Sequence, residues 1–203
     1  MIIIRDNLFI HPSLQAGMKL LEAIEKRRSI RKFKDKMVKW SLVLEAIDAA
    51  SKAPLAGNVN SLRFIIVTDQ DTKNELATYT DQAWISQADT IVVACSDDAT
   101  LEQLYNERGP IYARQQVGAA IQNFLLRITD LGLGACWIGA YLDRGVKEVL
   151  EIPEKINVEA IIPIGYPDEK PHPVRKEALE SRIYWDKWNV KKKPTLARDP
   201  KTW

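Results

Sequence analysis

The chain has 203 residues, which is enough for one domain with a substantial hydrophobic core. Its apolar fraction of 46% and charged fraction of 28% are ordinary for a globular protein, and a net charge of +2 gives no general attraction to nucleic acid. The charge is uneven: residues 171–203 carry nine Lys/Arg against four Asp/Glu, a net +5, so the basic excess lies in the C-terminal tail.

Two cysteines, Cys95 and Cys136, lie in apolar runs, with the spacing of neither a zinc site nor a disulfide framework. Buried free thiols fit a reducing compartment. The apolar start at residues 1–4 is too short for a signal peptide, and no apolar run approaches the length of a membrane span. We therefore expect a cytoplasmic protein that binds no membrane.

The first third of the chain predicts two helices, a loop and a strand. Ser13 and Ser41 are candidate N-caps, and Pro54 restricts the residue before it, which ends the second helix near residue 53. The predicted elements are a helix over 13–27, a helix over 41–53, a loop over 54–61 that is rich in turn formers, and a buried strand over 62–67.

The rest of the chain alternates helices and strands. Asp69 or Asp71 caps a helix to about residue 76, and Asp143 caps another to about residue 150. Pro163 predicts an edge strand or an irregular end. The other elements are a strand over 90–95, a long and broadly apolar helix over 111–131, a short apolar segment over 135–140, and a strand over 158–164. Mixed elements with few hairpin signals indicate an α+β fold.

Residues 25–33 place five cations around the hydroxyl of Ser29, just past a segment with helical spacing. Arginine binds phosphate through paired hydrogen bonds, and serine adds a short donor. We interpret this segment as an anion site for a phosphate-bearing cofactor. The alternative is that cations favour the negative end of a helix dipole.

The familiar catalytic sets are missing from the sequence. His11 and His172 are the only histidines, and both adjoin proline in loop-like sequence. Two such residues make neither a metal cluster nor a convincing catalytic triad. No glycine-rich dinucleotide fingerprint or P-loop is present. An enzyme without its own acid, base or metal often depends on a cofactor.

Four motifs follow one another along the chain at residues 27–33, 53–60, 132–139 and 164–167, with a basic segment rich in proline after them. Their order and spacing resemble the nitroreductase family of FMN-dependent oxidoreductases. The resemblance covers about residues 20–176. No single motif is specific, and the evidence is the order and spacing of all four.

The resemblance implies an α+β homodimer, with a central, mostly antiparallel sheet packed among helices and FMN bound at the subunit interface. We expect residues 1–203 to form one such domain, with an N-terminal extension over 1–12 and a tail over 177–203 that wraps the partner subunit. NADH or NADPH would reduce the flavin in a ping-pong reaction, and an electron-poor small molecule, such as a nitroaromatic or quinone, would reoxidise it.

The resemblance also assigns cofactor contacts by position. No side chain is assigned a catalytic role, because the chemistry belongs to the flavin. The phosphate, ribityl chain and ring edge of FMN would be bound by Arg27, Arg28, Ser29 and Arg31, and the phosphate also by Arg175 and Lys176. The flavin of the partner subunit would be contacted by Pro54, Leu55, Ala56, Asn58 and Asn60. The flavin ring would be lined by Trp137, Ile138, Gly139 and Ala140, whose backbone N–H groups would donate hydrogen bonds to it.

The chain departs from the family pattern at three places. Leu55-Ala56 stands where serine follows the loop proline, Asn60 stands where a longer amide is common, and Gly139 offers backbone where some members carry glutamate. Each assignment also has a structural alternative: Asn58 as a turn former, Trp137 as a core aromatic, and Arg175 as a solvated charge.

Other functions remain open on the sequence. A flavin storage or sensor protein without turnover would use the same cofactor site, and a specialised member of the superfamily would be flavin-destroying or dehalogenating. A binder of nucleic acid or anionic surfaces would use Lys191–Lys193 and the tail tryptophans, which we disfavour. Trp84, Tyr105 and Tyr112 are either a substrate lid or ordinary aromatics, and we favour the latter.

Overall fold

The computed structural model describes residues 18–173 and 176–192. These residues belong to two compact units, one that ends at Pro171 and one that begins at His172. The predictions made for Ser13, His11, Arg175, Lys193 and Trp203 lie outside the described residues. The assignment of all 203 residues to one domain with two extensions stays a prediction.

The first unit holds all of the strands and α-helices of the described chain. The helices are α1 (Leu20–Lys26), α2 (Trp40–Ser51), α3 (Gln70–Thr80), α4 (Ala99–Tyr105), α5 (Gly109–Asp130) and α6 (Asp143–Val149). The strands are β1 (Leu62–Val67), β2 (Thr90–Ser96), β3 (Gly134–Ala135) and β4 (Asn157–Gly165). Short 3₁₀ turns lie at Ala56–Asn58, Ala83–Gln87, Asn106–Arg108 and, in the second unit, Leu179–Arg182.

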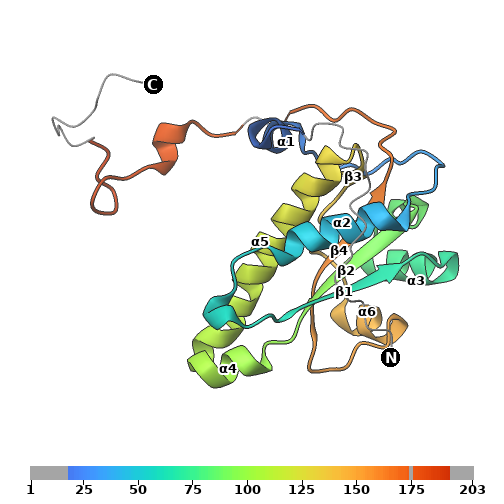
Figure 1. Cartoon of the computed structure of the whole chain (residues 1–203), viewed down its shortest axis with the longest axis horizontal. Coiled ribbons are helices and arrows are strands. Elements are labelled where there is room, and N and C mark those ends of the chain that lie inside the picture. The colour runs from blue at the N-terminus through green and yellow to red at the C-terminus, as the bar shows by residue number, and fades with distance from the viewer. Residues whose placement is uncertain (1–17, 174–175, 193–203) are drawn as a thin grey trace. The chain divides into compact units, whose positions relative to one another are not determined.

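The sheet has the order β1-β2-β4-β3, and every pair in it is antiparallel. Side chains of β2 alternate between two apolar clusters: Val92 and Ala94 join a cluster with α2 and α5, whereas Ile91 and Val93 join one with α3 and α6. Helices therefore cover both faces, which explains why β2 is apolar at consecutive positions. Figure 1 shows α2 and α5 lying together across one face. The predicted α+β class, with a mostly antiparallel sheet, is confirmed.

The predicted ends of β1 and the predicted cap of α3 were accurate, whereas other helix limits differed by a few residues. Strand β1 has the predicted limits, and the Asp69 side chain caps α3 by accepting the Thr72 N–H at 2.8 Å. Helix α3 continues to Thr80, four residues past its predicted end, and α5 begins at Gly109 instead of residue 111. Helix α4 was not predicted; it has seven residues, of which only Leu101 is buried, so its apolar pattern is short.

Other predictions were wrong. Ser41 and Asp143 are not N-caps: each lies within the first turn, and the capping positions are Lys39 and Leu142, without side-chain caps. Strand β4 is not an edge strand, since it pairs with both β2 and β3. The carbonyl of Pro163 accepts the Cys136 N–H at 3.3 Å, so this carbonyl points toward the end of β3. The N–H that proline lacks would point to the same side, so β4 loses no hydrogen bond to β2 at Pro163.

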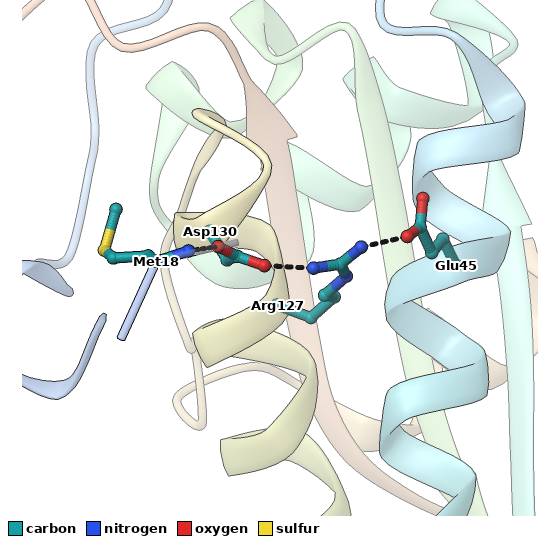
Figure 2. Close-up of polar contacts among 4 residues, drawn as sticks. All are labelled: Met18, Glu45, Arg127 and Asp130. Atoms are coloured by element: carbon teal, nitrogen blue, oxygen red, sulfur yellow. Dashed lines mark hydrogen bonds and ion pairs between the residues drawn. The ribbon is translucent and has the colours of Figure 1, made fainter. Parts of the chain in front are cut away.

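Ion pairs and a hydrogen bond connect the C-terminal end of α5 to neighbouring parts of the chain (Figure 2). Arg127 pairs with Glu45 of α2 and with Asp130, one turn further along α5. The second oxygen of Asp130 accepts the Met18 N–H at 2.6 Å. Met18 and Lys19 are therefore not helical, and α1 begins at Leu20 instead of near residue 13. One arginine thus connects α2, α5 and the entry to α1.

No helix in the described part of the chain combines the length and apolar character needed to cross a bilayer.

Candidate functional site

The cation-rich segment after α1 lies along the end of the sheet. Ile30 donates its N–H to the Ala135 carbonyl of β3 at 3.0 Å, and Lys34 donates to the Tyr166 carbonyl at 2.8 Å. The Lys32 carbonyl accepts the Asp168 N–H at 3.0 Å. Residues 27–34 therefore contact both β3 and the turn after β4, so the first motif meets the third and fourth in space although it precedes both by about 100 positions or more.

Two glycines make this approach feasible. A Cβ at Gly134 would lie 2.7 Å from Cγ1 of Ile30, and a Cβ at Gly165 would lie 2.7 Å from Cδ1 of Phe33. Both distances are shorter than carbon–carbon contact allows. The apolar residues that alternate with the cations therefore fit against glycine backbone, and the glycines of the third and fourth motifs position the first.

Glu169 adds an anchor that the sequence did not reveal. Its Oε1 accepts the backbone N–H of Arg31 and, at 3.1 Å, that of Lys32. The contact spans 138 positions, and no local pattern marks it. It holds the backbone of the segment by a carboxylate, while the side chain of Arg31 makes no hydrogen bond or ion pair with any described residue.

The five cations of the segment divide into two groups. Lys26 pairs with Glu22 at 2.6 Å, and the Arg28 guanidinium donates to the carbonyls of Glu25 and Arg27 at the end of α1. For Lys26 and Arg28, the alternative that cations favour the negative end of a helix dipole therefore holds. Arg27, Arg31 and Lys32 make no side-chain hydrogen bond or ion pair within residues 18–173 and 176–192, so their donors remain available to an anion.

Cys136 lies where these charges meet β3. Burial raises the pKa of its thiol, whereas the charge of Arg31, a hydrogen bond with Ser29 and the charge of Arg27 lower it. The side chains of Arg27, Ser29 and Arg31 are thus close enough to the third motif to act on one buried sulfur. The structure brings these three predicted residues together beside residues 136–140.

Residues 137–140 form an exposed strip next to that cluster. Ile138 exchanges two backbone hydrogen bonds with Ile161, each 3.0 Å long, and its side chain is buried. Trp137 is 41% exposed, and its ring tip lies near Gly118 of α5, so it is not a core aromatic. Gly139 and Ala140 are exposed, and neither backbone N–H has an acceptor among the described residues.

The loop of the second motif is held by a buried amide of α5. Gln116 accepts the Ala56 N–H at 3.0 Å and donates to the Val59 carbonyl at 3.3 Å and to the Ser61 hydroxyl. Gln116 was not among the residues predicted from the sequence. The available signal was one polar side chain on the helix face that Val117 and Ala120 share.

Backbone conformation explains several loop residues. Gly57 and Asn58 both have a left-handed φ, of 56° and 58°, so asparagine serves here as a turn former. Asn60 accepts the Leu62 N–H at 3.0 Å through its own side chain. Of the remaining predicted loop residues, Pro54 is exposed, and Leu55 and Ala56 are half-buried.

The loop and the cation cluster lie at different positions along α5. The loop is bound at Gln116, whereas the cluster adjoins β3, which follows the end of α5 at Asp130. Fourteen residues of helix at 1.5 Å each separate the two positions by about 20 Å. In Figure 1 the turn after α2 lies near α4, whereas β3 lies at the opposite end of α5. One chain therefore presents two separate groups of predicted cofactor contacts.

The remaining predicted residues have simple placements. Lys176 is exposed in the unit that begins at His172, and its role at the phosphate stays a prediction. Tyr105 packs edge-on against Tyr112, with ring centres 5.2 Å apart, and its hydroxyl covers Gly57. Trp84 packs against the α3 and α6 cluster.

Comparison with known proteins gives a consistent result. The model of the nitroreductase family matches residues 24–86 and 77–166. A Methanothermobacter thermautotrophicus protein, described as a candidate NADH dehydrogenase/NAD(P)H nitroreductase, is 35% identical over 176 residues, which are 84% of this chain and 88% of the relative. A similarly described Archaeoglobus fulgidus protein is 31% identical over 83% of this chain and 98% of its own.

A solved structure shares the fold. The NADPH:FMN oxidoreductase of Vibrio harveyi, in complex with NAD⁺, superposes with a TM-score of 0.76 at 25% identity, over 83% of this chain and 77% of that chain. The order of the motifs, the antiparallel sheet between its helices and these matches agree: the chain belongs to the nitroreductase family.

Proposed function

We propose that this protein is an FMN-dependent oxidoreductase that takes electrons from NADH or NADPH and passes them, by a ping-pong mechanism, to an electron-poor acceptor of the nitroaromatic or quinone class. The observation that carries the proposal is the group of unpaired cations, Arg27, Arg31 and Lys32, beside the exposed strip at residues 137–140. We further propose that it works in the cytoplasm, as its buried free thiols suggest.

The chemistry of the described residues fits FMN. A phosphate dianion needs several positive donors, and Arg27 and Arg31 provide two forks whose hydrogen bonds the rest of the described chain does not use. A flavin ring needs an apolar wall with polar edges, which an exposed Trp137 and the free N–H groups of Gly139 and Ala140 provide. A Cβ at Gly139 would meet nothing within 4 Å, so the backbone there is open to a ligand.

The protein's role in such a reaction is to bind and orient. FMN, when bound, would supply the chemistry by accepting hydride from the nicotinamide and giving electrons to the acceptor in separate half-reactions. The arginines would fix the phosphate end, and the strip at residues 137–140 would place its backbone donors along the edge of the ring. The name of the Vibrio harveyi relative pairs NADPH with FMN, which supports the same donor class and cofactor here.

We propose a homodimer with FMN at the interface, and two observations support it. Large apolar side chains are exposed on α1 and α2: Leu20 is 70%, Leu21 67% and Trp40 72% exposed. Such a patch needs a cover. In addition, the loop at Pro54 and the Arg27–Arg31 cluster are separated along α5, so a partner's loop would complete each site. An isologous dimer satisfies both, and the tail from residue 177 would wrap the partner.

The visible spectrum of the purified protein tests the cofactor and the donor together. We expect a flavin band that NADH or NADPH bleaches without oxygen, and recovery of the band when a quinone is added. The double variant Arg27→Gln with Arg31→Gln should lose FMN, whereas the matched control Lys26→Gln with Arg63→Gln should keep it. A wild-type protein that stays colourless after incubation with FMN would overturn the proposal.

A flavin storage or sensor protein without turnover is the second candidate. It is favoured by one observation: the strip at residues 137–140 offers backbone donors and no acidic or basic side chain. A flavin band that neither nicotinamide bleaches would support it over the enzyme.

A further inference from the structure

A cavity of about 340 Å³ opens beside Gly139, beyond the strip that we assign to the flavin ring. Its walls come from three elements and one loop. Arg114 belongs to α5, Asp143 and Lys147 to α6, Glu159 to β4, and Tyr141 to the segment that follows Gly139. Four of these residues carry a formal charge: Arg114, Asp143, Lys147 and Glu159.

Most of the polar groups in the wall already have partners. Lys147 Nζ donates to the Glu154 carbonyl at 2.7 Å, Glu159 accepts the Ser96 hydroxyl at 2.6 Å, and Tyr141 donates to the Val158 carbonyl at 2.8 Å. Burial raises the pKa of Tyr141, so its phenol remains protonated. Lys147 and Glu159 carry opposite charges, so together they add no net charge to the wall. The side chains still available to bind a ligand are therefore Arg114 and Asp143, which make no side-chain hydrogen bond or ion pair within the described ranges.

Arg114 is the better placed of the two for a ligand that contacts the flavin. It precedes Gly118 by four residues, and residues four apart share a face of a helix. Gly118 is the position over which the ring tip of Trp137 lies. Arg114 therefore stands on the same face of α5 as the proposed ring wall. Asp143 instead begins α6, where the positive end of the helix favours its negative charge.

We propose that this cavity is a subsite for the electron acceptor, and that Arg114 binds an anionic substituent of the acceptor, such as a carboxylate. The inference rests on the proposed function and deepens it by naming a substrate class. The guanidinium fork matches a carboxylate in two parallel hydrogen bonds. Gly139 belongs to the ring strip and also lines the cavity, and a Cβ there would meet nothing within 4 Å.

The test compares two acceptors of nearly equal size, 4-nitrobenzoate and 4-nitrobenzamide, on the FMN-loaded protein with NADH or NADPH. The quantity is the ratio of their kcat/KM values. We expect Arg114→Gln to lower the ratio about tenfold, as loss of one charged pair predicts. The control Arg144→Gln makes the same charge change on an exposed residue of α6 that does not line the cavity, and it should leave the ratio near the wild-type value.

Direct binding separates this inference from the proposed function. In calorimetry without nicotinamide, 4-nitrobenzoate should bind the FMN-loaded wild type and bind Arg114→Gln about tenfold more weakly. A wild type that holds FMN but reduces neither compound contradicts the proposed oxidoreductase, and the Arg114-dependent binding then identifies an anion site without the acceptor role. An unchanged ratio in Arg114→Gln, an equal fall in Arg144→Gln, or loss of FMN from Arg114→Gln would each overturn the subsite.

Discussion

Replacing Gly134 with alanine tests how the glycine of β3 positions the cation cluster. The added Cβ would lie 2.7 Å from Ile30 Cγ1 and 2.9 Å from Ile30 Cβ. Carbon atoms in contact prefer about 3.5–4.0 Å, so the two segments must separate by about 1 Å. Rotation of a flexible side-chain end cannot relieve this, because the Ile30 Cβ itself is too close. Ile30 is also buried and tied to Ala135 through its N–H.

The cost of Gly134→Ala follows from this geometry. Overpacking of a well-packed site costs about 1–3 kcal/mol, and we expect the free energy of unfolding of the apoprotein to fall by that amount. Urea denaturation followed by tryptophan fluorescence measures it. The matched control is Gly139→Ala in the same apoprotein, where the methyl meets nothing within 4 Å and the change should stay within about 0.5 kcal/mol.

A second mutation identifies the contact responsible. Ile30→Ala removes the Cγ1 and Cγ2 atoms that the new methyl would meet but keeps the Cβ at 2.9 Å, so it relieves part of the overlap. The double variant should therefore be less destabilised than the two single costs added together, by about 1 kcal/mol. The FMN affinity of Gly134→Ala should fall as the arginines move with Ile30. A Gly134→Ala protein as stable as the wild type, with additive single costs, would refute the reasoning that the glycine positions this segment.

Four further predictions concern single side chains. Arg127→Met should cost about 1–2 kcal/mol, since it leaves Glu45 and Asp130 without their shared cation, and the cost measured by urea denaturation should shrink in 1 M salt. Gln116→Met should cost about 1–3 kcal/mol by leaving the Ala56 N–H without its acceptor, and should raise protease cleavage within residues 54–61. The Cys95 thiol, whose pKa is raised to about 11 by burial and by the charge of Glu159, should resist Ellman's reagent at pH 8 until the protein unfolds. Hydrogen bonds from Thr72 lower the pKa of Asp69, so this cap stabilises the fold above about pH 4, and the stabilisation is lost as the pH falls through the lowered folded-state pKa. The urea midpoint of Asp69→Asn should therefore fall less than that of the wild type between pH 6 and pH 3. An equal fall in both proteins would contradict the assignment of this cap.

The strands and helices that carry strong local patterns were predictable. Strand β1 and the cap at Asp69 follow from apolar runs and capping chemistry that act within a few residues. Strand β4 shows where this approach fails. Pro163 argues locally for an edge, but its missing N–H faces the end of the two-residue strand β3, and the sequence gives no information about that partner.

The residue types of the candidate site could be predicted from the sequence, but the side chains that hold its backbone in place could not. The motif order identified Arg27, Ser29 and Arg31, yet a count of cations could not separate them from Lys26 and Arg28, which have local partners. Glu169 and Gln116 act across 138 and 60 positions, so only the folded chain shows them. Arg114 could not be singled out from the sequence either, since one arginine on a helix has no periodic signal.

The docking of residues 27–34 on β3 and the turn after β4 has a consequence for the order of folding. Closing a loop of more than 100 residues costs conformational entropy before any contact forms, so this segment should join the native structure late. On the ribosome, where about 5–20 residues are added each second, roughly 7–28 s pass between the synthesis of Arg31 and that of Glu169. During that interval residues 27–34 lack their contacts with β3, the turn after β4 and Glu169. The proposed anion-binding centre is therefore encoded near the beginning of the described chain but assembled only when nearly all of the first unit has been made.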